Sequence, residues 1–230
     1  MQALKEHVIK TRRRLYILLY FPVYLLIFFF LDYRELPLSE YTIVGTKWDQ
    51  YIPFCEYFVV FYYFWFFYIG LGVVLAYFEK DGKNYYRTCA YMFTGMTIFL
   101  LISALCPNRG FLRPVVFPRD NIFSYFVGLI YAVDTPTNLF PSIHVFNAIV
   151  VHISITNNSR FGNRPLVKWA SLFVTVGIVL STVFLKQHSI FDVLTGILMS
   201  VVLYVIVYHL GDQKFLARVG KYDKNMVVSE

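Results

Sequence analysis

Charged residues are scarce in this chain. Only 15% of its 230 residues are charged and 58% are hydrophobic, whereas a soluble domain carries roughly 25% charged residues. This composition excludes an ordinary soluble domain and predicts an integral membrane protein. The simplest organisation is a single membrane domain over residues 1–230.

Cysteine is also scarce. The three cysteines, Cys55, Cys89 and Cys106, lie within hydrophobic segments or near their ends. Their spacing indicates neither a disulfide framework nor a metal site. We expect no cleavable signal peptide, because the first apolar stretch is long enough to remain as a membrane span.

Long apolar runs, by contrast, are abundant. Six segments approach the roughly 20 apolar residues that a bilayer span requires. They predict an all-α, polytopic membrane protein with six transmembrane helices. The fourth segment is short, begins at a histidine motif and can start beneath the membrane surface. The predicted spans are 15–31, 54–78, 88–106, 142–156, 166–185 and 189–210.

The basic residues predict an orientation rather than a nucleic-acid partner, although the formal net charge is +7. With the N-terminus inside, 15 of the 21 Lys and Arg residues fall on the inner side. Because cytoplasmic loops carry an excess of Lys and Arg, we expect both termini to be cytoplasmic. The six outer basic residues are Arg34, Lys47, Arg109, Arg113, Arg119 and Lys186.

Two short motifs carry ionisable residues at the predicted outer face. The first is Pro141-Ser142-Ile143-His144, and the second runs from Ser181 through His188 to Asp192. Ionisable residues within a membrane are costly and usually functional. His188 and Asp192 are four residues apart, which predicts that they share one helix face. A carboxylate there can hold the imidazole tautomer, and His144 can exchange protons, which is the minimum set for a histidine nucleophile.

Each of these residues also has a simpler interpretation. A lone histidine near the end of a span is usually interfacial, and this is how we interpret His152 and His209. For His144 and His188, the joint spacing favours catalysis. Four outer cations close to the motifs indicate an anionic ligand, although three of them could instead extend to lipid phosphates. Those three are Arg109, Arg119 and Lys186.

The order of the motifs resembles the type 2 phosphatidic acid phosphatase superfamily. Members of that family have six spans and three motifs: Lys-x6-Arg-Pro, Pro-Ser-Gly-His and Ser-Arg-x5-His-x3-Asp. The resemblance extends over nearly the whole chain through span count and motif order. The matching positions are Arg113-Pro114 in the first motif, Pro141, Ser142 and His144 in the second, and Ser181, His188 and Asp192 in the third.

Three positions depart from the family pattern. Cys106 stands where the first-motif Lys would fall, Ile143 replaces the Gly, and Thr182 replaces the third-motif Arg. Arg109 and Lys186 are nearby candidates to replace the two missing cations. The weakened pattern is similar to the inositol phosphorylceramide synthase branch, which shows Pro-Ser-Leu-His and transfers a phosphoryl headgroup between lipids.

The resemblance implies a covalent phosphohistidine at His188 and no metal or other cofactor. His144 would protonate the leaving alkoxide and then take a proton from the acceptor. The planar guanidinium of Arg113 suits phosphate oxygens, and Ser142 and Ser181 can add hydrogen-bond donors. Phosphoryl transfer needs these parts: a nucleophile, cations around the phosphate and a proton source.

The predicted function is therefore an integral membrane enzyme that cleaves or transfers the phosphate group of a lipid phosphate ester. We expect the active site on the extracytoplasmic side of the plasma membrane, with membrane lipids as partners and no nucleic acid. One alternative is a sphingolipid-synthase-like headgroup phosphotransferase. Another is a non-catalytic binder or transporter of anionic lipids. A third is a metal site built from the two histidines and the carboxylate, which the nearby cations disfavour. The sequence indicates no oligomeric state.

Overall fold

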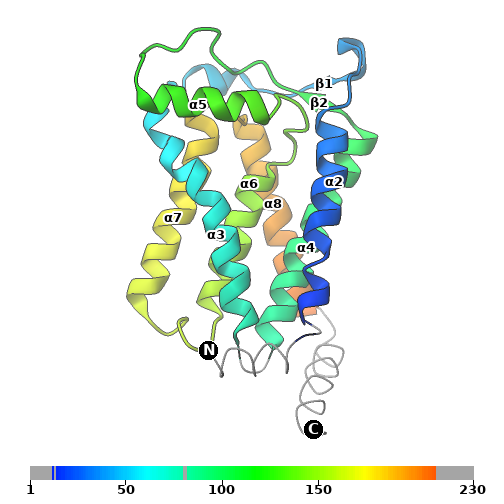
Figure 1. Ribbon diagram of the computed structural model, residues 1–230, viewed down its shortest axis with the longest axis vertical. Helices are drawn as coiled ribbons and strands as arrows, with labels where there is room; N and C mark the ends of the chain where they lie inside the picture. Colours follow the sequence, from blue (N-terminus) through cyan, green and yellow to red (C-terminus); the bar gives the residue numbers. More distant parts are fainter. Residues whose placement is uncertain (1–11, 13, 80–81, 211–230) are drawn as a thin grey trace, which may run out of the picture.

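The computed structural model describes residues 12, 14–79 and 82–210 of the chain. Six helices run along its long axis, and one shorter helix lies across one end of this bundle (Figure 1). The long-axis helices are α2 (Tyr20–Asp32), α3 (Val59–Tyr77), α4 (Lys83–Leu105), α6 (Ile143–Thr156), α7 (Pro165–Phe184) and α8 (Ile190–Tyr204). The crossing helix is α5 (Ile122–Val133), and α8 continues as the π-helical turn η4 (Val205–Leu210).

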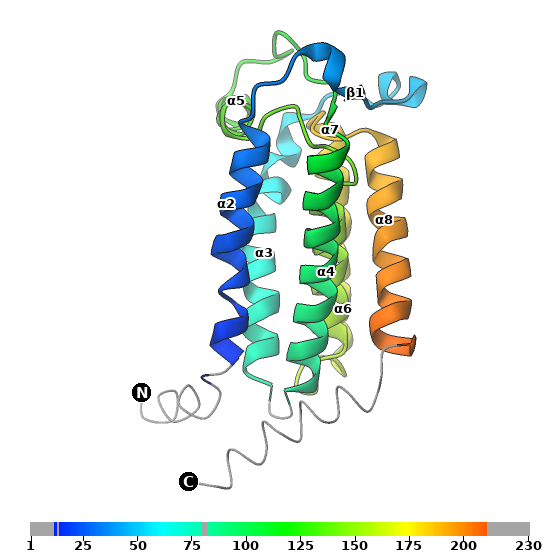
Figure 2. The ribbon, with the colours of Figure 1, turned by 90° about the vertical axis from the view of Figure 1, so that its right-hand side faces the viewer.

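The connections on the α5 side carry the remaining short elements. Strands β1 (Thr42–Ile43) and β2 (Asn108–Arg109) pair in parallel. Three 3-10 turns are η1 (Leu38–Glu40), η2 (Lys47–Gln50) and η3 (Glu56–Phe58). Figure 2 shows that α5 and the strand region lie at the same end of the bundle. The helical class expected from the sequence is confirmed.

Five helical segments of the described part are long and apolar enough to cross a membrane, one fewer than the sequence predicted. The predicted fourth span appears as α6, which has 14 residues and is about 21 Å long at 1.5 Å per residue. A bilayer core is about 30 Å thick. The apolar helices support an integral membrane protein, and α6 alone is too short to span the bilayer.

Helix α6 is the centre of the bundle. It packs against α3, α4, α7 and α8, and ten of its 14 residues are buried. Phe146 of α6 is fully buried and lies against Gly95 of α4, where an added Cβ would be 2.1 Å from the ring. The surrounding helices therefore shield α6 from lipid, which allows a short helix at this position.

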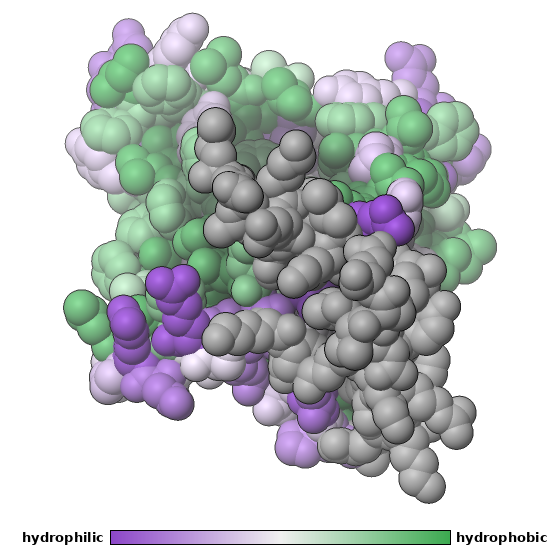
Figure 3. All heavy atoms as spheres, turned by 60° about the horizontal axis from the view of Figure 1, so that its bottom comes forward, coloured by the Kyte–Doolittle hydropathy of each residue, from purple (hydrophilic) through white to green (hydrophobic). Residues whose placement is uncertain are grey.

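The described part also shows how the two ends of the bundle differ in charge. The start of α2, the end of α3, the start of α4, the α6–α7 turn and the end of α8 all lie opposite α5 (Figure 1). Lys83, Arg160 and Arg164 belong to these turns and helix starts, and Figure 3 shows hydrophilic side chains gathered at this end. The two termini, predicted to be cytoplasmic, lie outside the described residues.

One element was absent from the sequence prediction. The sequence predicted no helix between the spans 88–106 and 142–156, but this segment contains α5. The side chain of Asn121 caps this helix by accepting hydrogen bonds from the backbone N–H groups of Phe123 and Ser124. Tyr131 then donates its hydroxyl to the backbone oxygen of Leu185, at 2.6 Å. Helix α5 is thereby fastened over the end of α7.

Candidate active site

The structure brings together the two motif histidines, which are 44 residues apart in the sequence. His144 lies in the first turn of α6, and His188 lies in the turn between α7 and α8. Nδ1 of His144 is 3.1 Å from Nε2 of His188. Only 9% of His144 and 5% of His188 are exposed. The pair is therefore a largely desolvated contact at the α5 end of the bundle.

Asp192 faces His188, but not in the way the spacing predicted. Helix α8 begins at Ile190, so His188 precedes the helix, and the expectation of a shared helix face is wrong. Ser189 and Asp192 form a capping box in which the Asp192 carboxylate accepts the Ser189 N–H at 2.8 Å. Such a cap starts the helix at the residue that follows Ser189. Oδ2 of Asp192 lies 3.7 Å from Nδ1 of His188.

These contacts favour one arrangement of protons. A hydrogen bond between two imidazole nitrogens needs one donor and one acceptor. The fully buried carboxylate of Asp192 favours a proton on the neighbouring Nδ1 of His188. Nε2 of His188 then carries the lone pair and accepts from Nδ1–H of His144. This leaves a nucleophilic nitrogen facing a proton donor.

Two aromatic side chains of α3 hold His144. The Tyr62 and Trp65 ring centroids lie 4.8 and 4.3 Å from that of His144. Nε1 of Trp65 also donates to the His144 backbone oxygen at 3.2 Å. The sequence predicted a span over residues 54–78 and no site residue within it, so it missed both residues. The available signal was a Tyr and a Trp three residues apart among Phe residues.

Arg113 is the predicted phosphate ligand that lies beside this pair. Its Nη2 donates to Gln187 Oε1 at 2.5 Å and to the Asp134 backbone oxygen at 2.7 Å. The guanidinium also lies over the Tyr131 ring, 4.4 Å from its centroid. Burial lowers the pKa of Arg113, and the charge of Asp134 opposes that shift. Because Gln187 directly precedes His188, Arg113 lies next to the proposed nucleophile.

The other predicted cations make their contacts elsewhere in the described part. Nζ of Lys186 donates to the backbone oxygens of Asp49 and Ile52, at 2.7 and 2.5 Å, and burial lowers its pKa. The Arg109 guanidinium lies 5.5 Å from the centroid of the Phe111 ring. Lys186 thus holds the connection before α3, and the Arg109 guanidinium packs beside Phe111; neither contact involves the histidines.

Arg119 likewise holds a loop. Its Nε and Nη2 each lie 2.6 Å from an oxygen of the Glu56 carboxylate. Glu56 is fully buried at the start of the α3 segment and also accepts from Asn121 at 2.8 Å. This bidentate pair fixes the segment before α5 against α3.

The two motif serines are buried and make local hydrogen bonds. Oγ of Ser142 caps α6 by accepting from the Val145 N–H at 3.4 Å. The Ser142 N–H donates to the Asp192 backbone oxygen at 3.1 Å. Oγ of Ser181 donates to the Ile178 backbone oxygen at 2.6 Å. Ser142 thus ties the start of α6 to α8, and Ser181 bonds within its own helix.

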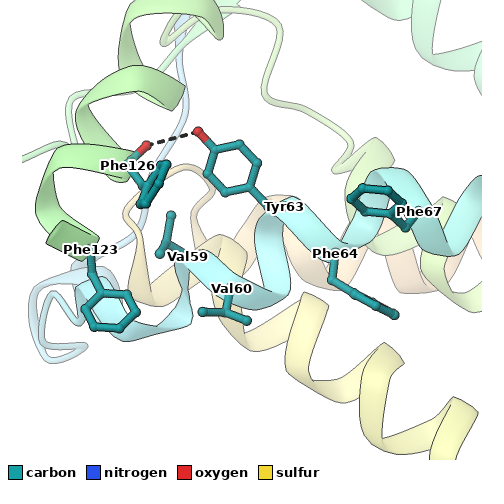
Figure 4. A pocket seen from close by; sticks show the side chains of 7 residues that line it. All are labelled: Val59, Val60, Tyr63, Phe64, Phe67, Phe123 and Phe126. Atoms are coloured by element: carbon teal, nitrogen blue, oxygen red, sulfur yellow. Dashed lines mark hydrogen bonds between the residues drawn. The ribbon is translucent and has the colours of Figure 1, made fainter.

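No cluster of three or more His, Cys, Asp or Glu side chains suited to a metal ion occurs among the described residues. A separate apolar pocket of about 340 Å³ lies between α3 and α5 (Figure 4). Its one side-chain hydroxyl, that of Tyr63, donates to the Phe126 backbone oxygen. Neither motif histidine lines this pocket. The lining residues are Val59, Val60, Tyr63, Phe64, Phe67, Phe123 and Phe126.

Comparison with known families adds one finding. The family model of the PAP2 superfamily matches residues 113–216. The matched segment contains Arg113 and both histidine motifs, whereas Cys106 and Arg109 precede it. The comparisons with curated proteins and with solved structures gave no match.

Proposed function

Since residues 113–216 of this chain match the family model of the PAP2 superfamily, we propose that it is a membrane enzyme that cleaves or transfers the phosphate group of a lipid phosphate ester. The observation that carries the proposal is the line of His144, His188 and Asp192. Nδ1 of His144 and Nε2 of His188 are 3.1 Å apart, and the buried carboxylate of Asp192 lies behind His188. In the proton arrangement given above, His188 offers a nitrogen lone pair and His144 offers a proton. Family membership and the apolar helices support a lipid substrate.

The proposed reaction has two steps. In the first, Nε2 of His188 forms a bond to phosphorus, the ester P–O bond breaks, and Nδ1–H of His144 gives its proton to the leaving alkoxide. In the second, the acceptor hydroxyl loses its proton to His144 and attacks phosphorus, and the P–N bond breaks. Both histidines return to their initial protonation states. The phosphoryl group must enter between the two rings, so the 3.1 Å contact has to open when substrate binds.

Asp192 and Arg113 support these steps in different ways. The phosphorylated imidazole of His188 gains positive character, which a carboxylate near Nδ1 stabilises. The Arg113 guanidinium lies beside the same turn, where it can offer N–H groups to phosphate oxygens. We also propose that Lys186, Arg109, Ser142 and Ser181 contribute to phosphate binding. Their present contacts are with groups other than the two histidines, so these side chains would have to turn toward the bound phosphate.

We also propose that the site faces the extracytoplasmic side. The histidine pair lies at the α5 end of the bundle, opposite the basic turns that contain Lys83, Arg160 and Arg164. Such basic turns favour the cytoplasmic side. The plasma membrane is the proposed location.

A headgroup phosphotransferase is the second candidate, and one observation favours it. Lys186 bonds to backbone oxygens, Arg119 pairs with Glu56, and Arg109 packs beside Phe111. Arg113 is the predicted cation that bonds to the residue preceding His188. A phosphodiester carries one negative charge and needs fewer cations than a phosphomonoester. The acceptor would then be a lipid or sugar hydroxyl instead of water.

The decisive experiment incubates the purified protein with a panel of lipid phosphates and phosphodiesters, with and without lipid alcohols, and identifies products by mass spectrometry. We expect turnover by the wild type, sensitivity to vanadate and persistence in excess chelator. His188→Ala should abolish turnover, and His144→Ala should come close to doing so. The matched control is His209→Ala, because His209 is exposed at the other end of the bundle. Wild-type rates in a folded His188→Ala protein would refute the nucleophile and leave a lipid binder or transporter.

A further inference from the structure

A second acidic side chain approaches the histidine pair, on Asp134, just after α5. We propose that Asp134 is a positioning residue for the pair, which holds His144 through Tyr62 and the His188 turn through Gln187. This inference rests on the proposed phosphoryl-transfer function and adds a residue outside both histidine motifs.

The first link runs to His144. The hydroxyl of Tyr62 donates to Oδ2 of Asp134 at 2.6 Å, and the Tyr62 ring lies against the His144 ring. Tyr62 is only 2% exposed, so its hydroxyl needs a buried acceptor. Asp134 supplies that acceptor and thereby fixes the ring that orients the proton donor.

The second link runs to His188. Nε2 of Gln187 donates to the same Oδ2 of Asp134 at 3.3 Å, and Oε1 of Gln187 accepts from Arg113. Arg113 also donates to the Asp134 backbone oxygen, so these three residues form a closed hydrogen-bond network. The backbone N–H groups of Gln187 and His188 both donate to the Thr182 oxygen. The hydrogen bonds among Asp134, Gln187 and Arg113 therefore fix the turn from which His188 projects.

Asp134 also contributes charge. The groups that act on its carboxyl come from four elements: Tyr62 of α3, Arg113 of the preceding loop, His188 of the α7–α8 turn and Asp32 at the end of α2. Burial raises the pKa of Asp134, whereas the Tyr62 hydrogen bond and the charges of Arg113 and His188 lower it. The Asp134 carboxylate therefore lies close enough for its charge to act on the histidine pair.

The loop before α6 is held by residues other than Asp134. The positioning role proposed for Asp134 is therefore distinct from support of this loop. Asp32 accepts from the hydroxyls of Thr135 and Thr137 at 2.8 and 3.2 Å. Oδ1 of Asn108 accepts the backbone N–H groups of Leu139 and Phe140 at 2.7 and 3.0 Å. The loop is therefore held by Asp32 and Asn108, and the Asp134 carboxylate bonds to the two residues next to the histidine pair, Tyr62 and Gln187.

The test combines two readouts on full-length protein in detergent. One is the pH dependence of kcat/KM, and the other is the NMR spectrum of the labelled ring nitrogens of the histidines, of which the chain has five. Asp134→Asn keeps an oxygen that can accept from Tyr62 but removes the charge. Because a negative charge beside the pair is lost, we expect the acid limb of kcat/KM to move to lower pH and the ring-nitrogen signals of His144 and His188 to change position. The control is Asp120→Asn, an exposed carboxylate in the same connection, which should move neither.

Tyr62→Phe is the second variant and keeps the proposal testable if Asp134→Asn does not fold. It retains the ring against His144 but removes the hydrogen bond to Asp134, so kcat should fall about tenfold with little change in KM. Unchanged kcat in Tyr62→Phe, or an unmoved acid limb and unmoved ring-nitrogen signals in folded Asp134→Asn, would overturn the proposal. If the wild type turns over no substrate while the ring-nitrogen signals of His144 and His188 still move in Asp134→Asn, the positioning role stands and the proposed function fails.

Discussion

Asp192 has two structural tasks at the residue scale. One carboxylate oxygen both caps α8 through the Ser189 N–H and faces Nδ1 of His188. The other oxygen, Oδ1, has no hydrogen-bond partner among the described residues, although it is buried. An uncompensated buried carboxylate is costly, and the imidazole of His188 is the polar group that faces this one. The two tasks can be separated by substitution.

We expect Asp192→Asn to fold and to lose activity. The amide oxygen can still accept the Ser189 N–H from the third helical position, as Gln does in a capping box, but it cannot stabilise the imidazolium. Turnover should fall by roughly 10²–10⁴-fold with little change in Tm. Asp192→Ala should lose both the rate and about 1.5–3 kcal/mol of stability, which is typical of a hydrogen bond to a charged group. Equal Tm losses in the two variants would show that charge, and not capping, stabilises the helix start.

At the element scale, the site depends on how closely α8 approaches the start of α6. Gly196 of α8 faces that start, and an added Cβ would lie 2.7 Å from the Ser142 oxygen and 3.3 Å from Cβ of Val145. Backbone atoms cannot yield as a flexible side chain can. The distance between His144 and His188 is therefore set partly by a glycine that carries no chemistry.

Gly196→Ala tests this dependence. The methyl group should force α8 away from α6, weaken the contact between the Ser142 N–H and the Asp192 oxygen, and reduce both Tm and kcat; overpacking typically costs about 1–3 kcal/mol. Gly70→Ala is the matched control, because an added Cβ at Gly70 of α3 meets nothing within 4 Å. It should leave kcat and Tm near wild type. Normal kcat in Gly196→Ala would mean that the helix contact does not set the geometry of the pair.

The sequence predicted most elements from hydropathy, and its errors have physical causes. Helix α4 begins at Lys83 and not near residue 88, because its first turns are polar and escape a search for apolar runs. Helix α5 was missed because 12 residues are too few for a span, although Asn121 before an apolar run is a capping signal. His188 was placed in a helix because the spacing rule ignores capping by Ser189.

For the candidate site, local motifs were enough to select His144, His188 and Asp192. They could not select Tyr62, because α3 is apolar on all sides and its sequence does not show which face turns inward. The role of Lys186 was also hidden. Its contacts are with backbone oxygens of the connection between α2 and α3, which are more than 130 residues earlier in the chain, and no local pattern predicts such contacts.

At the scale of the whole molecule, charge separates the two ends of the bundle. The end with α5 contains the histidine pair and several cations whose charged groups bond to backbone oxygens or to side chains such as that of Glu56. The opposite end carries Lys83, Arg160 and Arg164 on exposed turns and helix starts. Basic residues beside apolar helices resist transfer across the membrane, so this asymmetry predicts one orientation for the entire bundle and for the site.

Cysteine labelling in intact cells tests that orientation. Cys55, Cys89 and Cys106 are replaced first, since Cys106 is exposed, and single cysteines are introduced at Lys47, Val115, Lys83 and Arg164, all exposed positions. Lys47 and Val115 lie in the connections at the α5 end, so an impermeant maleimide should label them from outside. Lys83 and Arg164 should react only after permeabilisation. The reverse pattern would place the histidines on the cytoplasmic side, where a substrate in the outer leaflet could not reach them.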